Sequence, residues 1–256
     1  MTEEKHRPSS FLATKGLFPD ATYRAFQRWD LAASLEENVH HVRTANTVGG
    51  PSLGWLKDFG KVLLRRFGPN GPEPILVELA QHGCDTSVWK PLLLWHGTQT
   101  DQLLFDFISD WLFSEYDRGV VRLTTQSAKS FLRHYLSNAQ QKWSDTNITA
   151  SASGMLRTAA LFGLITSGRV RQFTPFRLSD ESFLYCAHDL VQRVGSTARV
   201  VADPSWRLFF MSAAIVESEL LRLHQMHRLQ FNRAGSLFEL RLPFTSAAEY
   251  ARRMIA

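Results

Sequence analysis

The sequence predicts a mainly α protein: a helical bundle with an embedded winged helix-turn-helix-like module and short β-hairpins. Most apolar residues recur at three- and four-residue spacing, which is typical of amphipathic helices. Ser, Thr, Asp or Pro stands at the start of several of these segments, where such residues cap helices. Residues 164–173 and 231–243 instead alternate in polarity around a turn, which indicates two hairpins.

The first 119 residues predict a bundle of about five helices, after a loose tail at residues 1–10. Ser52 can cap one helix, and Pro74 can occupy the first turn of the next. The segment WKPLLLW, from Trp89, opens a strongly apolar region. The expected helices are one or two between residues 20 and 42, then residues 52–67, 74–83 and 98–119.

The next part of the chain contains two predicted helices separated by a short turn. Thr124 or Thr125 can cap the first helix, whose apolar residues have helical spacing. The segment WSDTN then forms a turn, because Asp and Asn favour turns. The second helix is expected to begin at Thr149 or Ser151 and to end at Gly163.

A basic β-hairpin is expected directly after the second helix. The segment LITSGRVRQF, residues 164–173, places Ser167 and Gly168 as a two-residue turn between β-prone arms. Another helix, capped by Ser179, is expected over residues 178–194. Helix, turn, helix and hairpin in this order predict a winged helix-turn-helix-like module.

The second helix of this module has two different faces. Its apolar face consists of residues such as Met155 and Leu156, at helical spacing. Small residues surround Arg157 on the opposite face, and they would allow close approach to a nucleic-acid groove. The same pattern can mean packing against another helix, so shape alone leaves both interpretations open. The residues of the small face are Ala150, Ser153, Gly154, Arg157 and Ala160.

Positive charge is concentrated in the same region. Between Thr124 and Arg177, seven lysines and arginines accompany a single acidic residue, Asp145, which gives a net charge of +6. The remainder sums to −1, although the whole chain carries +5. Such a concentration indicates a surface for a polyanion, with an idle basic surface as the alternative.

The candidate nucleic-acid-binding residues come from both helices and the hairpin. Arg169 and Arg171 alternate with Val170, so both are expected on one face of the hairpin, against phosphate. Protection of an exposed strand edge by charge is the alternative for these two arginines. The complete candidate set is Lys129, Arg133, Lys142, Ser151, Ser153, Arg157, Arg169 and Arg171.

The C-terminal part, residues 198–256, predicts a long helix, a β-hairpin and a short last helix. Asp203 and Pro204 are a strong helix start, and that helix is expected to run to about Arg228. The hairpin has its expected turn at residues 233–236, and the last helix covers residues 246–256. This part, residues 1–119 and residues 120–197 are expected to pack as one compact body.

The histidines of this C-terminal part raise the question of a metal site. His224 and His227 are three residues apart on the predicted helix, but no third ligand lies nearby, so buried or rim histidines are favoured. Carboxylates also recur at Asp101, Asp106 and Asp110, where the solvated face of a helix is favoured over acid–base or metal chemistry. We therefore expect no metal and no cofactor.

The remaining composition excludes several classes of protein. The first ten residues contain no apolar run, and the most apolar stretches are about half a membrane span, so no signal peptide or membrane anchor is expected. Cys84 and Cys186 fit neither a metal nor a redox spacing and suggest a reducing compartment. We therefore expect a cytoplasmic protein without membrane contact. No catalytic arrangement has a recognisable spacing, so we expect no enzyme.

The order of apolar and aromatic positions resembles one known family. WKPLLLW, TDQLLFDFISDWLFSEYDRG and the later LSDESFLY resemble the BrxA family of bacteriophage-exclusion (BREX) defence systems, over roughly residues 40–190. The resemblance implies a small, mostly helical, cytoplasmic DNA-binding protein, encoded beside a methyltransferase, an ATPase and a phosphatase-like protein. It offers no catalytic residues and no contacts to carry over.

Two functions follow as hypotheses. The leading one is a non-enzymatic component of a BREX-type antiphage system that binds double-stranded DNA through the basic helix and wing. The alternative is a protein–protein adaptor that scaffolds other defence components through its winged-helix module. The expected partners are therefore double-stranded DNA and other BREX-type defence proteins.

Overall fold

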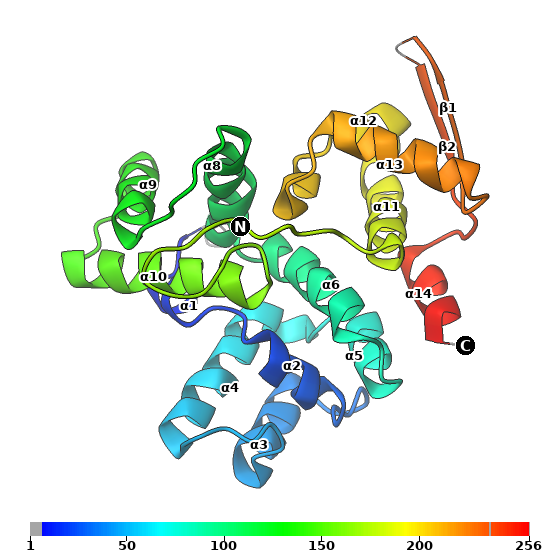
Figure 1. The fold of residues 1–256 in the computed structure, drawn as a ribbon. Coiled ribbons are helices and arrows are strands. Elements are labelled where there is room, and N and C mark those ends of the chain that lie inside the picture. Colours follow the sequence, from blue (N-terminus) through cyan, green and yellow to red (C-terminus); the bar gives the residue numbers. More distant parts are fainter. Residues whose placement is uncertain (1–6, 236, 256) are drawn as a thin grey trace.

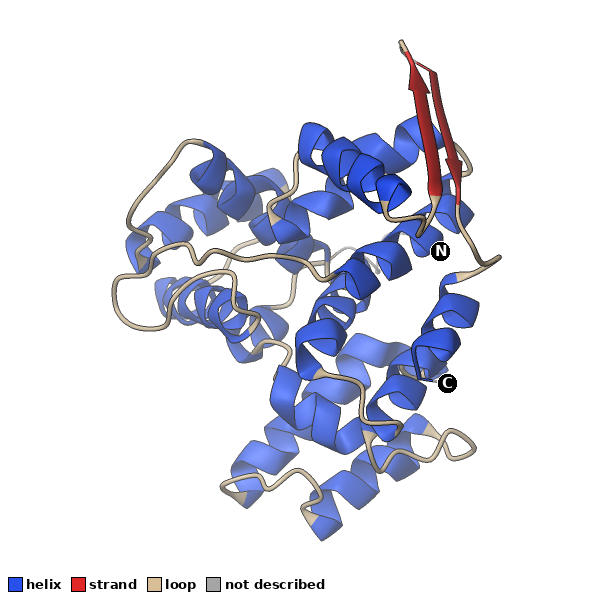
Figure 2. Ribbon diagram, turned by 45° about the vertical axis from the view of Figure 1, so that its right-hand side comes forward, coloured by secondary structure: helices blue, strands red, loops and turns tan. Residues whose placement is uncertain are grey.

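The computed structural model describes residues 7–235 and 237–255 and is mainly helical, as the sequence predicts. A single two-stranded antiparallel sheet is present in this part of the chain. Figure 1 shows the first helices in blue and cyan, α9 and α10 beside them, and the hairpin at the other side of the molecule. Figure 2 shows the two strands, in red, projecting past the helices at one side of the molecule.

The N-terminal bundle contains the helices that the sequence predicts and two additional ones. Ser34, with Glu37, forms a capping box, and Ser52 caps its helix as expected. Pro74 occupies the first turn of its helix, also as expected. The bounds are α1 (Ser10–Lys15), α2 (Pro19–Phe26), α3 (Leu35–Ala45), α4 (Leu53–Phe67), the 3-10 turn η2 (Gly68–Asn70), α5 (Pro74–Gln81) and α6 (Thr86–Gln99).

Two of these elements differ from the expectation. The tail was expected to extend to residue 10, but Ser9 caps α1, which begins at Ser10; residues 1–6 lie outside the described part. The apolar WKPLLLW segment is helical and belongs to α6, with Pro91 inside the helix. Trp89 and Trp95 of that segment are buried in the core.

The predicted helix over residues 98–119 is divided at its start. Asp101 follows the end of α6 and caps a new helix. This helix consists of α7 (Gln102–Asp106), the π-helical η3 (Phe107–Leu112) and α8 (Phe113–Asp117). Gly119 follows with a φ of +69°, a conformation that glycine adopts without strain.

The rest of the described chain is again helical except for one hairpin. Thr124 caps α9 with a capping box, and Ser179 caps α11 as predicted. The bounds are α9 (Thr125–Asn138), α10 (Asp145–Leu161), α11 (Asp180–Val194), α12 (Thr197–Ala202), the 3-10 helix η4 (Pro204–Phe209), α13 (Ala213–Gln225), β1 (Gln230–Ala234), β2 (Leu237–Arg241) and α14 (Ala247–Ile255).

The prediction of one long helix over residues 204–228 is wrong. Pro204 opens only the 3-10 helix η4, because Phe210 adopts a left-handed conformation with φ 58°. Ser212 then caps α13, which ends at Gln225. The chain therefore reverses between two short helices where a single helix was expected.

The C-terminal hairpin is confirmed. Phe231 pairs with Leu240 and Asn232 with Glu239 across antiparallel strands. The pairing continues to Ala234 and Leu237, so the turn is tighter than the predicted residues 233–236. Residue 236 of that turn and residue 256 of the last helix lie outside the described residues.

Buried apolar side chains form one cluster that runs from α1 through α6 and α10 to α14. The N-terminal bundle, the basic region and the C-terminal elements all contribute to it. The division of the chain at residues 119 and 197 remains a prediction.

A polar network lies within this core between α6 and α11. The Trp95 indole donates to an Asp189 carboxylate oxygen at 2.7 Å, and Arg193 pairs with the same carboxylate at 2.9 Å. The His96 Nε2 atom lies 2.8 Å from the Tyr185 hydroxyl. Burial lowers the pKa of His96 to about 4.

A second core histidine lies further along α11. His188 stacks on the Tyr250 ring with 4.9 Å between ring centroids, and burial lowers its pKa as well.

None of the helices described here is long and apolar enough to cross a membrane.

Candidate nucleic-acid interface

α9 and α10 pack against each other and form the helix pair that the sequence predicts. The inner face of α9 is buried through Ala128, Leu132 and Leu136. The connecting turn includes Gln140 in a left-handed conformation, with φ 53°. The second helix starts earlier than expected, because Ser144 caps it and Asp145 is already helical.

The segment after α10 returns along the residue that precedes α9. Leu123 and Arg171 exchange two backbone hydrogen bonds, of 2.8 and 3.0 Å, as an antiparallel bridge. Ile165 forms a second antiparallel bridge with Phe173. Three chain segments therefore meet beside the helix pair, although the bridges are isolated and do not extend into named strands.

The predicted two-residue turn at Ser167 and Gly168 is wrong. The Thr166 amide donates to the Gln172 carbonyl at 2.8 Å, and the Gln172 amide donates to the Thr166 hydroxyl at 2.9 Å. These bonds enclose the five residues between them. The tip is therefore wider than a tight hairpin and exposes Arg169.

The short helix α1 covers part of the small-residue face of α10. A Cβ atom at Gly154 would lie 2.4 Å from the carbonyl oxygens of both Ala13 and Thr14. The Ser151 hydroxyl donates to the Ser10 carbonyl at 3.3 Å and lies 3.2 Å from the Thr14 hydroxyl. Helix-on-helix packing therefore accounts for this part of the face.

Ser151 is consequently not available as a nucleic-acid contact, contrary to the sequence expectation. Its side chain is fully buried between α1 and α10. Ser153 is half-buried and lies beside the covered strip, while Arg157 is exposed. Of the candidate residues on α10, Ser153 and Arg157 are therefore the ones that a ligand can reach.

A buried ion pair fixes α1 in this position. The Arg66 guanidinium has 1% side-chain exposure and lies 2.8 Å from an Asp101 carboxylate oxygen. It also donates to the Gly16 carbonyl at 3.3 Å, at the end of α1. Asp101 therefore does not belong to a solvated row of carboxylates, whereas Asp110 is exposed.

Arg157 lies at the open edge of α10, and Arg169 and Arg171 lie on the segment that follows this helix; we call these three residues the wing cluster. The Arg157 guanidinium donates to the Thr14 carbonyl at 2.6 Å, which holds its side chain at the edge of α1. Burial, with a smaller contribution from nearby Arg157, lowers the pKa of Arg171. No ion pair joins any of the three to a carboxylate among the residues that the structure describes.

The Arg171 side chain also contains a hydrogen-bond donor that the described part of the chain leaves unpaired. Its Nε–H group is buried and has no hydrogen-bond partner within the described residues. An unpaired buried donor costs free energy of roughly 1–3 kcal/mol, and more for a charged group.

The two cations of α9, in contrast, form ion pairs with a carboxylate. The Lys129 ammonium lies 3.2 Å from one Asp145 carboxylate oxygen, and the Arg133 guanidinium lies 2.5 Å from the other. Hydrogen bonds from Arg133 and Lys129 lower the pKa of Asp145. The Lys129 side chain is only 14% exposed, so this residue is a poorer phosphate contact than expected.

Lys142 lies in the turn between the two helices and is exposed. It borders a 570 Å³ cavity together with Trp143, Leu136 and Ile148. Arg133 reaches the same cavity, which combines an apolar floor with two cations. The structure therefore brings the turn lysine close to α9, and the wing cluster forms a separate group on α10.

No metal centre is found among the described residues. His224 uses its Nδ1 atom to accept a hydrogen bond from the Phe231 amide at 3.3 Å, which ties α13 to β1.

The fold and the exposed charge define a mainly helical protein that presents a basic edge on a pair of packed helices. A family model for BrxA matches residues 10–189, and the chain belongs to the BrxA family. Membership in this family implies a role in BREX phage defence.

The fold is similar to that of a solved structure. The crystal structure of an uncharacterized protein from Magnetospirillum magneticum superimposes with a TM-score of 0.60, at 15% sequence identity. The similarity covers 80% of this chain and 100% of that chain. No curated protein matches the sequence.

Proposed function

We propose that the protein is a non-enzymatic, cytoplasmic DNA-binding component of a BREX system, and that it holds duplex DNA with the wing cluster. The observation that carries this proposal is a set of three guanidinium groups on α10 and the segment after it, which have no carboxylate partner among the residues that the structure describes. Arginine forks match phosphate oxygens in geometry as well as charge.

The order of elements supports a winged helix-turn-helix. The helix at residues 102–117 precedes the bridge residue Leu123, and α9, α10 and the returning segment follow. Leu123 pairs with Arg171 on the returning arm, as a strand before the helix pair would pair with a wing. In this arrangement α10 is the recognition helix.

The position of α1 limits what α10 can do in a groove. Ser151, Gly154 and Thr158 are buried, so the open edge offers few side chains to base edges. Ser153 and Arg157 are the remaining candidates on the helix itself. We therefore propose binding dominated by phosphate contacts, with little discrimination between sequences.

The test is a gel shift on duplex DNA of random sequence across a salt series. For about five neutralised phosphates, log K falls by about 0.9 per phosphate against log salt. The Arg169→Glu, Arg171→Glu variant should lose most of the affinity. Affinity that does not change with salt, or a variant that binds like the wild type, would contradict the proposal.

A second candidate function is favoured by the cavity between α9 and α10. Leu136, Trp143 and Ile148 give it an apolar floor, which suits a hydrophobic side chain of a protein partner. The module would then act as an adaptor for other BREX components. Co-purification with such a component that Trp143→Ala abolishes, with no DNA retardation at physiological salt, would favour this function over DNA binding.

A further inference from the structure

The C-terminal part contains a second concentration of positive charge. Between Arg222 and Ile255 six arginines accompany only Glu239 and Glu249, which gives a net charge of +4 with neutral histidines. Once this segment and residues 124–177 are set apart, the remainder of the chain carries −5. Two basic regions therefore stand out against an acidic background.

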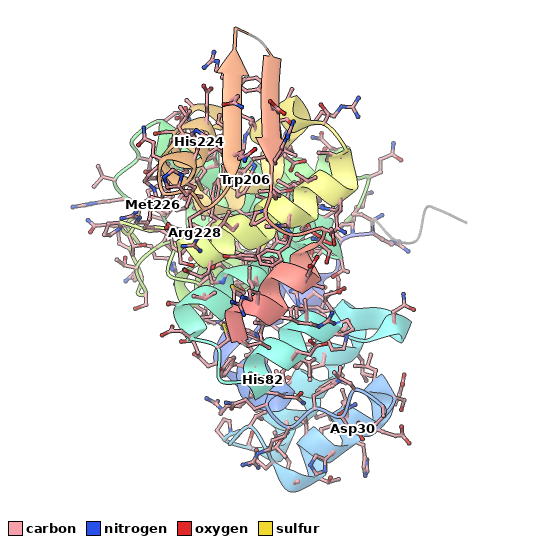
Figure 3. The ribbon with its side chains drawn as sticks, turned by 90° about the vertical axis from the view of Figure 1, so that its right-hand side faces the viewer. Asp30, His82, Trp206, His224, Met226 and Arg228 are labelled. Atoms are coloured by element: carbon pink, nitrogen blue, oxygen red, sulfur yellow. The ribbon has the colours of Figure 1, made fainter. Side chains whose placement is uncertain are left out.

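This second region is hollowed at the base of the hairpin. The chain leaves α13 at Met226, turns through His227 in a left-handed conformation (φ 55°) and enters β1 at Gln230. A cavity of 560 Å³ lies there; we call it the hairpin groove. Figure 3 shows His224 and Arg228 near the base of the hairpin. The polar residues that line the groove are His224, His227, Arg228, Gln230, Asn232 and Arg241.

The lining has the chemistry of an anion site. Imidazole, guanidinium and amide groups can all donate hydrogen bonds, and no carboxylate belongs to the described residues that line the groove. Arg228 lies 3.8 Å from Glu181, and Arg241 lies 2.7 Å from Glu239, both outside the lining. Exposed pairs of this kind contribute about 0–1 kcal/mol, so a phosphate can displace the carboxylate at little cost.

A neighbouring cavity extends the groove. It has a volume of 440 Å³, shares His227 and Arg228 with the groove, and adds Arg253 together with one carboxylate, Glu181. Tyr250 also lines it: this residue is 5% exposed, and its hydroxyl has no hydrogen-bond partner among the described residues. A ligand oxygen in this cavity would supply the missing acceptor for the hydroxyl.

The groove is separate from the wing cluster. In Figure 1 the hairpin stands at the far side of the molecule from α9 and α10. It also lies outside residues 10–189, which match the family. One short contact with nucleic acid therefore does not account for both basic regions.

We propose that the hairpin groove is a second phosphate-binding site, which holds the backbone of nucleic acid away from the wing cluster. The ligand class rests on the proposed function, namely binding of duplex DNA. A backbone phosphate offers non-bridging oxygens to Arg228 and Arg241, with Asn232 as an additional donor. The groove thereby lengthens the stretch of DNA that one molecule contacts.

The deciding experiment is photo-crosslinking of the full chain to labelled duplex DNA. Benzoylphenylalanine is placed at Asn232 in the groove, at Gln172 on the wing, and at Glu36 on the bundle as a control. We expect crosslinks from Asn232 and Gln172 and none from Glu36. Crosslinks from Gln172 alone would contradict phosphate binding in the hairpin groove and leave the proposed function intact. Crosslinks from Asn232 alone support the groove and overturn the role of the wing, and crosslinks from neither position overturn both.

Charge variants give an independent measurement. The Arg228→Gln, Arg241→Gln variant should lose affinity a few-fold, and its salt slope should fall by about 2, at about 0.9 per lost phosphate contact. The Arg28→Gln, Lys57→Gln variant removes the same formal charge from the bundle and should keep the wild-type slope. Equal slopes in the two variants would overturn the proposal; a thermal unfolding curve for each shows whether it is folded.

Discussion

The two basic regions contain similar numbers of arginines but differ in whether these arginines form ion pairs with carboxylates. In the C-terminal part, Arg222 pairs with Asp180, Arg233 with Glu217 and Arg252 with Glu78. In the region of α9 and α10, Asp145 pairs with Lys129 and Arg133, whereas no carboxylate of residues 7–235 or 237–255 pairs with the wing cluster.

This difference shows that the net charge of a sequence segment differs from the unpaired charge that the folded surface presents to a ligand. Carboxylates from α5, α11 and α13 neutralise the C-terminal arginines, although those carboxylates precede residue 222 in the sequence. Near α10, the described part of the chain supplies no such partner for the wing cluster. We therefore expect the wing cluster to provide most of the affinity and the hairpin groove a smaller share.

The largest effect should separate free from paired arginines. Arg157→Gln, Arg169→Gln, Arg171→Gln should weaken duplex binding by about 10- to 100-fold at physiological salt, because up to three phosphate contacts are lost. Arg222→Gln, Arg233→Gln, Arg252→Gln removes the same formal charge from paired positions. Fluorescence anisotropy should show a much smaller loss for this second triple variant. Equal losses would mean that net charge alone governs binding.

The next effect concerns the surface that α10 presents. Gly154→Val should lower the free energy of unfolding by about 1–3 kcal/mol, because its side chain would collide with the α1 backbone. Ser153→Val, one residue away at a half-buried position, should cost less than about 1 kcal/mol. Urea denaturation measures both variants. Equal losses would show that contact with α1 does not restrict position 154.

Acid should act on the core and leave both arginine regions charged. Burial holds the pKa of His96 at about 4 and lowers that of His188, while an unfolded histidine titrates near 6.5. Below pH 6.5 the unfolded chain therefore binds more protons than the native protein, so stability falls as the pH decreases. We expect a loss on the order of 2 kcal/mol between pH 7 and pH 5, measured by urea denaturation. His96→Gln, His188→Gln should flatten this dependence; an unchanged dependence would exclude these histidines as its cause.

The smallest effect is a gain. Asp145→Asn should raise affinity for duplex DNA a few-fold, because Lys129 and Arg133 lose the carboxylate that neutralises them. Stability should fall slightly, since Asp145 is an acidic residue in the first turn of α10. Glu36→Gln, also in a first helical turn, is the matched control and should leave affinity unchanged. A loss of affinity in Asp145→Asn would show that this carboxylate positions the two cations for binding.

Features governed by neighbouring residues could be predicted from the sequence. Thr124 and Ser179 cap their helices as expected, because a cap depends on residues within one turn. The apolar face of α10 is likewise buried, including Met155 and Leu156. The break at Phe210 was missed, since neither glycine nor proline marks that left-handed residue.

Features governed by distant residues could not be predicted. Ser151 was expected at a groove, but α1, more than 130 residues earlier in the chain, covers it. The state of Lys129 depends on how the turn places Asp145, which local spacing does not reveal. Contact of Arg157, Arg169, Arg171 and Lys142 with DNA remains a prediction.

The packing of α1 on α10 also has a consequence for how the protein folds during synthesis. Residues 10–16 leave the ribosome before their partners at residues 151–158, which follow more than 130 residues later. Closing so long a loop is entropically costly and slows folding, so this contact is expected to form late. A fragment that starts at residue 102 would leave Ser151, Gly154 and Thr158 uncovered. We therefore expect the basic region to reach its final structure only after α1 has packed on α10.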